Sequence, residues 1–394
     1  MSKTIPEEYR QYTLGLAVFD AVPVLLFLMS TVVIYSMYGS PVFLAGAIAC
    51  FLGGSSKVLW KLIVVLRKQD TENLTKAFRI LMFGGFAIML LAVVISAVTD
   101  ITRGVVPLGP VKGIPGAGGT LADLWDALTM MPAALFFIAG IAGMCCMGYL
   151  GSHMDNSARS NWIEELTNAV SQAAILIGVI IVYFGMYYHA SDAAFKALKS
   201  DENVNVTGIE EGYYFDGAGT DAALVFYPGA KVETEAYAPL MHILAEKGVD
   251  CYLCRMPGNF ALFEMDMAGE IQEEFREGDQ EYTGTDNNYD RWYIGGHSLG
   301  GAAASMVVSD DSEDWYGLAL LAAYPTEKIS IPVLSIYGTE DTVLNSEKYG
   351  KAGSKGLWPD DFTELVIQGG NHAQFGCYGE QKGDGAAQIT SDDQ

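Results

Sequence analysis

The stretch RWYIGGHSLGG, residues 291–301, contains the pattern that decides the fold of the second half of the chain. Residues 291–296 are typical of a buried β-strand, and the residues from Leu299 to Ser309 favour a helix. Between them, Gly296-His297-Ser298-Leu299-Gly300 has the G-x-S-x-G pattern of a nucleophile elbow, a sharp strand-to-helix turn that exposes a serine. The alternative is a glycine-rich turn with an incidental serine. The position between a strand and a helix favours the elbow, with Ser298 above the sheet edge and near a helix N-terminus that stabilises negative charge.

Strands and helices alternate around this motif. Short apolar runs predict six strands, at 223–228, 251–257, 291–296, 316–325, 332–338 and 363–370. Helical spacing predicts intervening helices at 236–247, 262–275 and 299–309. Such alternation indicates an α/β fold with a mostly parallel sheet and helices on both faces. We expect this domain to occupy residues 221–394, preceded at 191–220 by a polar linker and a β-hairpin.

A serine nucleophile needs a histidine base, and the base needs an orienting acid. The chain has five histidines, His153, His189, His242, His297 and His372. The first two belong to the apolar half, the third lies within a predicted helix, and the fourth is expected to face away from Ser298. His372, on the loop after the last strand, is therefore the predicted base. The loop after 332–338 supplies the acid, for which Asp341 is favoured over Glu340.

The tetrahedral intermediate of acyl transfer also needs two backbone N–H donors for its oxyanion. Leu299 supplies one, because it directly follows the predicted nucleophile. The loop after the first predicted strand, Tyr227-Pro228-Gly229-Ala230-Lys231, should supply the other. Gly229 permits the turn, and the N–H of Ala230 is the predicted donor.

Residues 221–384 resemble the α/β-hydrolase superfamily, and within it the compact bacterial group of dienelactone-hydrolase-like enzymes. The motifs that carry this resemblance are YPGAKVE (227–233), GGHSLGG (295–301), LLAAYP (320–325), YGTEDTVL (337–344) and GGNHAQFG (369–376). The resemblance implies catalytic roles for Ser298, Asp341 and His372, in the chain order that the superfamily uses. The group proper has a cysteine nucleophile where this chain has serine, so its specificity for ring lactones is not inherited. Only six residues separate Pro325 from Pro332, where members often insert a cap, so we expect an open site without a cap domain.

The first half of the chain has a different composition. Residues 1–200 carry 13 Lys and Arg against 12 Asp and Glu, whereas residues 201–394 carry 10 against 35, giving net charges of +1 and −25. Five apolar stretches are long enough to cross a bilayer, at roughly 12–38, 41–66, 77–99, 127–151 and 165–189. We therefore expect an all-α transmembrane domain over residues 1–190, and a cell-membrane protein with several spans. We recognise no family for this half.

Two features of this half allow two interpretations each. Lys57 and Lys61 could line a path through the bundle; the favoured interpretation is that the span ends near Ser56 or that both lysines snorkel to an interface. The Gly/Pro-rich segment 101–127 is either a substrate-facing loop or a plain connector, and the connector is favoured.

The distribution of short-loop lysines and arginines predicts the orientation. With the N-terminus in the cytoplasm, that side holds Lys3, Arg10, Arg67, Lys68, Lys76, Arg79 and Arg159, and the other side holds Arg103, Lys112, Lys196 and Lys199. Five spans then place the C-terminal domain outside the cytoplasm.

These features favour a membrane-anchored serine hydrolase that cleaves an ester or related acyl bond of a small-molecule or lipid-like substrate. Such chemistry requires no metal and no organic cofactor. The acidic C-terminal half argues against nucleic acid as a partner, and the oligomeric state is left open. The alternatives are a transporter or sensor with a non-catalytic, hydrolase-like ligand-binding domain, and an acyltransferase that uses the same triad.

Overall fold

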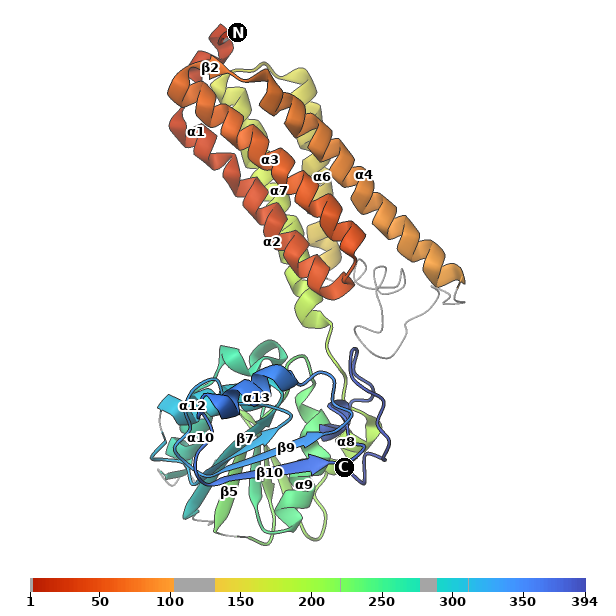
Figure 1. Ribbon diagram of the computed structural model, residues 1–394, viewed down its shortest axis with the longest axis vertical. Coiled ribbons are helices and arrows are strands. Elements are labelled where there is room, and N and C mark those ends of the chain that lie inside the picture. The colour runs from red at the N-terminus through yellow and green to blue at the C-terminus, as the bar shows by residue number, and fades with distance from the viewer. Residues whose placement is uncertain (1–2, 103–131, 220, 277–288, 311) are drawn as a thin grey trace. The chain divides into compact units, whose positions relative to one another are not determined.

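The computed structural model describes residues 3–102, 132–219, 221–276, 289–310 and 312–394. These residues form two compact units, and the chain passes from the first to the second between Gly185 and Met186 (Figure 1). Most of the Gly/Pro-rich segment 101–127 lies outside the described residues.

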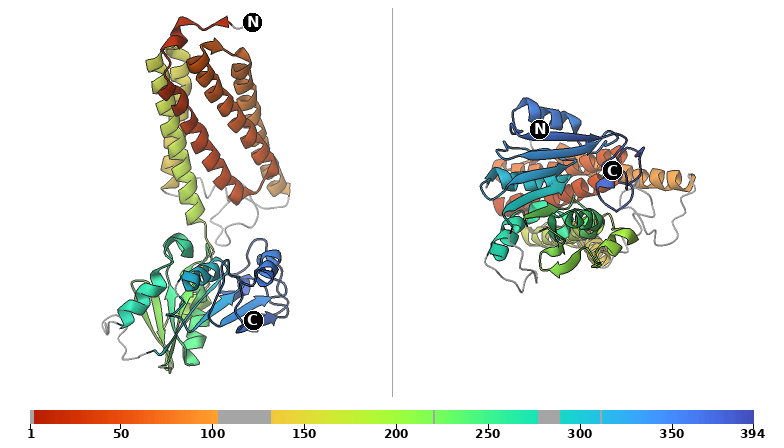
Figure 2. Two further views of the ribbon diagram at one scale, coloured as in Figure 1. Left: turned by 60° about the vertical axis from the view of Figure 1, so that its left-hand side comes forward. Right: turned by 90° about the horizontal axis from the view of Figure 1, so that it is seen from below.

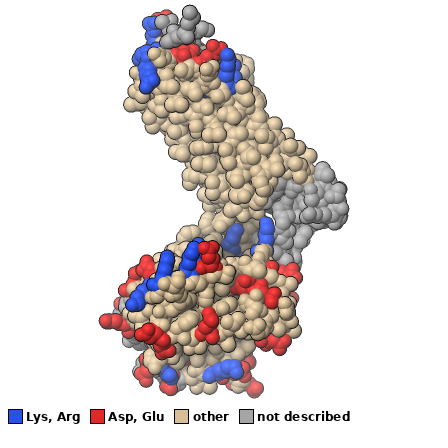
Figure 3. Space-filling model, viewed as in Figure 1, with Lys and Arg blue, Asp and Glu red and all other residues tan. Residues whose placement is uncertain are grey.

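The N-terminal unit is a bundle of α-helices. Its helices are α1 (Leu14–Phe19), α2 (Ala21–Tyr38), α3 (Pro41–Arg67), α4 (Glu72–Thr102), α6 (Ala133–His153) and α7 (Ala158–Gly185). Among the described residues, five segments are long and apolar enough to cross a membrane, at Leu14–Met37, Pro41–Arg67, Glu72–Ile95, Ala133–His153 and Ala158–Gly185. The five predicted spans are thereby confirmed, although the last begins seven residues earlier than expected. The face drawn in Figure 3 is almost free of charged side chains along the length of this bundle.

Glycines let two of these helices approach closely. A Cβ on Gly46 of α3 would lie 2.7 Å from the carbonyl oxygen of Gly85 on α4. A Cβ on Gly85 would lie 2.6 Å from the carbonyl oxygen of Gly46. Small residues at such contacts are typical of helices that pack in a membrane, where backbone proximity maximises van der Waals contact.

The prediction that the second span ends near Ser56 is wrong, because α3 continues to Arg67. Lys61 does not reach an interface either, since its side chain is only 1% exposed. Its Nζ lies 2.6 Å from Oδ1 of Asp20 and 3.3 Å from Oε1 of Glu165 on α7. Lys61 is therefore buried and paired with two carboxylates, and it is not solvated at an interface as expected.

Lys57, one helical turn earlier, bonds to the same carboxylate. Its Nζ lies 2.5 Å from Oε1 of Glu165, and its side chain is partly exposed. We call Asp20, Lys57, Lys61 and Glu165 the charge cluster. It joins the residue between α1 and α2 to α3 and α7, and its formal charges sum to zero.

The C-terminal unit is built around one eight-stranded sheet. Its strands are β3 (Asn205–Ile209), β4 (Gly212–Asp216), β5 (Ala222–Tyr227), β6 (Asp250–Cys254), β7 (Arg291–His297), β8 (Gly317–Leu321), β9 (Val333–Gly338) and β10 (Phe362–Ile367). Their order is β10-β9-β8-β7-β5-β6-β4-β3. The six strands from β5 to β10 are parallel where they pair, and they correspond to the six predicted strands. The antiparallel hairpin β3–β4 extends the sheet beyond β6.

Helices cover both faces of this sheet (Figure 2). They are α8 (Asp192–Ala197), α9 (Ala238–Glu246), α10 (Met267–Arg276), α12 (Leu299–Asp310) and α13 (Ser346–Ser354), with short 3₁₀ turns η2 (Thr234–Tyr237), η3 (Pro257–Asn259), η4 (Ala261–Phe263) and η5 (Ala373–Phe375). Alternate residues of a strand point to opposite faces. In β5, Val225 packs into the core beneath α10 and α12, and Phe226 into the core beneath α9.

The parallel arrangement brings the carboxyl ends of six strands, β5 to β10, to one edge of the sheet. Tyr227 of β5 pairs with Gly296 of β7, and His297 pairs with Leu321 of β8. The loops that carry all the predicted site residues leave the sheet from this edge. Residues 322–332, between β8 and β9, contain no helix or strand, so no cap domain is inserted there.

Candidate functional site

Ser298 occupies a sharp turn between β7 and α12. Its φ is +54°, a left-handed conformation that costs energy for a residue with a side chain. The turn is held by two backbone hydrogen bonds, from Ser298 N to Leu321 O at 2.9 Å and from Ala302 N to Ser298 O at 3.1 Å. Such an over-determined, strained turn is the geometry of the predicted nucleophile elbow.

The glycines around Ser298 are needed because backbones approach closely there. A Cβ on Gly296 would lie 2.5 Å from the carbonyl carbon of Gly300. A Cβ on Gly300 would lie 2.2 Å from Tyr227 O and 2.3 Å from Pro228 O. The start of α12 therefore packs directly against the loop after β5.

Asp341 and His372 are brought together from loops that are far apart in sequence. Nδ1 of His372 lies 2.8 Å from Oδ2 of Asp341, and both side chains are almost completely buried. The other carboxylate oxygen of Asp341 accepts the backbone N–H groups of Val343 and Leu344, at 2.9 and 2.8 Å. The aspartate is thus fixed by its own loop and orients the imidazole. The competing acid Glu340 instead accepts a hydrogen bond from Thr339.

The structure does not join Ser298 to His372 by a hydrogen bond. Nε2 of His372 is buried and has no hydrogen-bond partner among the described residues. The ring of His297, the residue before Ser298, lies 4.4 Å from the ring of His372. His372 therefore lies beside the elbow. Its Nδ1 bonds to Asp341, and its Nε2 has no hydrogen-bond partner among the described residues.

The loop after β5 leaves one N–H without a partner, that of Ala230. Gly229 N donates to the hydroxyl of Tyr237 at 3.1 Å, Lys231 N donates to Asn259 O at 2.8 Å, and Val232 N donates to Gly229 O at 3.2 Å. The Ala230 N–H has no acceptor within the described chain. Leu299 is the first residue of α12, so its N–H lacks an acceptor within the helix. These are the two groups predicted to bind an oxyanion.

His297, which was expected to face away from Ser298, lies beside the predicted base His372. Its ring is completely buried between the rings of His372 and Tyr237, and its Nδ1 lies 2.7 Å from the Tyr237 hydroxyl. Burial first, and then the charge of His372, lower the pKa of His297 well below its usual value, so the ring is neutral at pH 7. Tyr237 was not anticipated from the sequence, because nothing in TEAYAPLM distinguishes it from an ordinary core aromatic.

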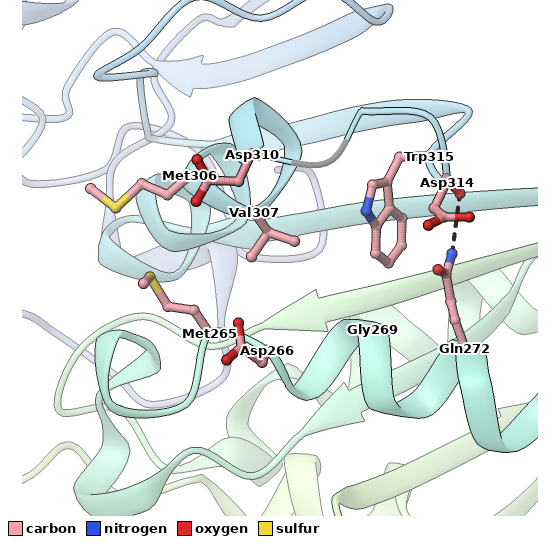
Figure 4. A pocket seen from close by; sticks show the side chains of 9 residues that line it. All are labelled: Met265, Asp266, Gly269, Gln272, Met306, Val307, Asp310, Asp314 and Trp315. Atoms are coloured by element: carbon pink, nitrogen blue, oxygen red, sulfur yellow. Dashed lines mark hydrogen bonds between the residues drawn. The ribbon is translucent and has the colours of Figure 1, made fainter.

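A surface cavity of about 210 Å³ lies elsewhere in this unit (Figure 4). It is lined by residues of α10 and the two positions before it, of α12, and of the segment before β8, among them Asp266, Gln272 and Trp315. Gln272 Nε2 donates to Asp314 O at 3.2 Å on one side of it. None of the predicted site residues lines this cavity, so we do not assign the chemistry to it.

Cys251 and Cys254 lie on β6 as buried free thiols, as expected for extended residues too far apart to form a disulfide. Among the residues that the structure describes, no three histidine, cysteine or acidic side chains gather in a way that could hold a metal ion.

A comparison with family models agrees with the fold of the C-terminal unit. Residues 223–394 match the model of the alpha/beta hydrolase family. No curated protein matches the chain. Among solved structures, the chain is similar to a predicted CIB-like hydrolase from Thermoplasma acidophilum, with 16% sequence identity and a TM-score of 0.33 over 43% of this chain and 88% of the other.

Proposed function

Because residues 223–394 form an α/β-hydrolase domain, we propose that this protein is a membrane-anchored serine hydrolase that cleaves ester or related acyl bonds. The observation that carries the proposal is the buried hydrogen bond between His372 and Asp341 beside the strained turn at Ser298. A histidine oriented by an acid next to a serine is the arrangement that activates a hydroxyl for attack on a carbonyl.

In the proposed mechanism, Oγ of Ser298 attacks the carbonyl carbon while Nε2 of His372 takes its proton. Asp341 holds the second proton of the imidazole on Nδ1 and stabilises the imidazolium that forms. Nε2 has no competing partner within the described part of the chain, and hydrogen bonds of this kind often tighten only when substrate binds.

The negative charge on the carbonyl oxygen is then bound by the N–H groups of Leu299 and Ala230. Collapse of the intermediate breaks the bond to the leaving alcohol, which takes the proton from His372. Water, deprotonated by His372, attacks the acyl-enzyme and releases a carboxylic acid, so that Ser298 regains its proton. The sum is ester plus water giving acid plus alcohol, and every proton is returned.

Ester hydrolysis by matched serine variants tests this proposal. Hydrolysis of p-nitrophenyl acetate by the full chain should fall about 10³-fold or more in Ser298→Ala, because the residual rate comes only from binding and the oxyanion donors. Ser309→Ala, on the same helix with its hydroxyl bonded to Met306 O, is the control and should keep the wild-type rate within about twofold. Equal rates for the two variants would refute the role of Ser298.

We further propose that the hydrolase domain lies outside the cytoplasm. The excess of lysine and arginine on the loops that share a side with the N-terminus supports this orientation. Protease added to intact cells should then cleave the C-terminal domain. Cleavage seen only after the cells are lysed would place it in the cytoplasm.

A further inference from the structure

An exposed apolar segment lies at the same sheet edge as the proposed catalytic residues. After β6 the chain forms residues Phe260 to Phe263, in which Leu262 is 41% and Phe263 is 61% exposed. The rings of Phe260 and Phe263 lie 5.7 Å apart. Among the described loops that follow a parallel strand, these two are the large apolar side chains that remain exposed. We call residues 260–263 the apolar segment.

The apolar segment contacts both elements that carry a proposed oxyanion donor: the loop after β5, which carries Ala230, and helix α12, which begins at Leu299. Asn259, which precedes it, accepts the N–H of Lys231, the residue after Ala230, at 2.8 Å. Ala261 of η4 is buried in the same core as Ala303 and Ala304 of α12, the helix that begins at Leu299. The apolar segment is therefore anchored to the two elements that carry the proposed oxyanion donors.

The loop after β5 is also tied to the chain that leaves the last candidate span. Tyr188 N donates to Lys231 O at 2.6 Å, and Glu233 N donates to Tyr188 O at 2.9 Å. Ala190 N donates to a carboxylate oxygen of Glu233 at 2.6 Å. Because α7 ends at Gly185, only two residues separate that span from Tyr188. The last candidate span and the loop after β5 are therefore linked by only a short stretch of chain.

We propose that the substrate is an ester with a long apolar acyl chain, taken directly from the lipid bilayer, and that the apolar segment binds this chain. The inference rests on the proposed hydrolase function and adds the substrate class to it. The chain of the substrate covers Leu262 and Phe263, and so removes apolar surface from water on both partners. Hydrolysis then releases a fatty acid and the alcohol from which it was cleaved.

The test compares two esters with one set of full-length proteins in phosphatidylcholine vesicles. One ester, 4-methylumbelliferyl oleate, is dissolved in the bilayer, and the other, p-nitrophenyl acetate, is dissolved in the buffer. The variant Leu262→Ser/Phe263→Ser removes the exposed part of the apolar segment. The control Ile243→Ser/Leu365→Ser removes side chains of similar exposure, 49% and 51%, from α9 and β10.

We expect the ratio of oleate to acetate hydrolysis to fall about tenfold or more in the first variant, because two large apolar contacts are lost. In the control the ratio should stay within about twofold. An unchanged ratio in the first variant, an equal fall in the control, or a wild type that hydrolyses acetate but no oleate would overturn the substrate assignment. Failure of the hydrolase function itself looks different, since the wild type would then hydrolyse neither ester faster than Ser298→Ala.

Discussion

The two carboxylate oxygens of Asp341 accept hydrogen bonds from different groups. Oδ1 accepts two backbone N–H groups of its own loop, and Oδ2 accepts the N–H of His372. Glu340 is one residue away and has the same charge, but its longer side chain bonds to Thr339 instead. Position in the loop, and not charge alone, therefore decides which acid can orient the imidazole.

This difference predicts unequal effects of two amide substitutions. Asp341→Asn keeps the shape but supplies an N–H where an acceptor is needed, which favours the wrong imidazole tautomer. We expect kcat for p-nitrophenyl acetate to fall by about 10³- to 10⁴-fold. Glu340→Gln should stay within about twofold of wild type. Comparable losses in the two variants would contradict the assignment of the acid.

Burial keeps the ring of His297 neutral, and a hydrogen bond joins this ring to Tyr237. The Tyr237 hydroxyl accepts the N–H of Gly229, so its one proton is donated to Nδ1 of His297. Burial raises the pKa of Tyr237, which keeps that proton in place. The pair thus fixes the loop that carries Ala230 and the ring that packs against His372. We regard both as positioning residues.

A buried neutral histidine makes stability depend on pH. Burial holds the pKa of His297 below its usual 6.5, so on acidification the unfolded chain binds a proton that the folded chain does not. The stabilisation is complete above about pH 6.5 and is lost as the pH falls toward the lowered pKa. The advantage of wild type over His297→Asn should therefore shrink by about 1.4 kcal/mol per pH unit below about pH 6.5. Urea unfolding, followed by tryptophan fluorescence, measures it; an advantage independent of pH would contradict the buried neutral ring.

At the scale of elements, the strands and spans could be predicted because their signals are local. Apolar runs of the right length mark β5 to β10, and GHSLG marks the turn before α12. The role of His297 could not be found this way, because its surroundings come from Tyr237 and His372, which are 60 and 75 residues distant in the chain. The partners of Lys61 are similarly remote, since Asp20 and Glu165 lie on other helices.

The charge cluster stabilises the helical bundle only when both of its lysines and both of its carboxylates are present. Lys61 neutralises two carboxylates that are themselves almost completely buried. Breaking a buried ion pair leaves an uncompensated charge in an apolar interior, which is far costlier than losing an exposed pair.

Removing one lysine from the cluster should therefore destabilise the bundle strongly. We expect Lys61→Met to lower the free energy of unfolding by about 3–5 kcal/mol. Lys76→Met removes the exposed pair with Glu72 on α4, and should cost only about 0.3–0.5 kcal/mol. Denaturation of the full chain in mild detergent, followed by circular dichroism, provides the comparison. Equal costs would show that Lys61 is not buried with its partners.

At the scale of the whole molecule, the boundary between the two units decides how the hydrolase domain can be isolated. Residues 186–191 are bonded to the loop after β5, and α8 buries Ala194. The sequence predicted a domain beginning at residue 221, because residues 186–191 have no strand or helix pattern and α8 is only six residues long.

A chain that begins at residue 186 should therefore hydrolyse p-nitrophenyl acetate within about twofold of the full chain. One that begins at residue 200 loses three hydrogen bonds to the catalytic loop, which are worth about 1 kcal/mol each. We expect its free energy of unfolding to be lower by about 3 kcal/mol and its activity to fall. Urea unfolding and the ester assay check both, and identical behaviour of the two chains would show that residues 186–199 do not support the site.

The most direct test of the proposed chemistry is the position of a covalent adduct. A fluorophosphonate probe reacts only with a serine whose hydroxyl is activated, and peptide mapping by mass spectrometry then identifies the modified residue. We predict one adduct per chain, on Ser298, and none in Ser298→Ala. An adduct on another residue, or equal labelling of wild type and variant, would contradict the assignment of Ser298, Asp341 and His372 as one catalytic unit.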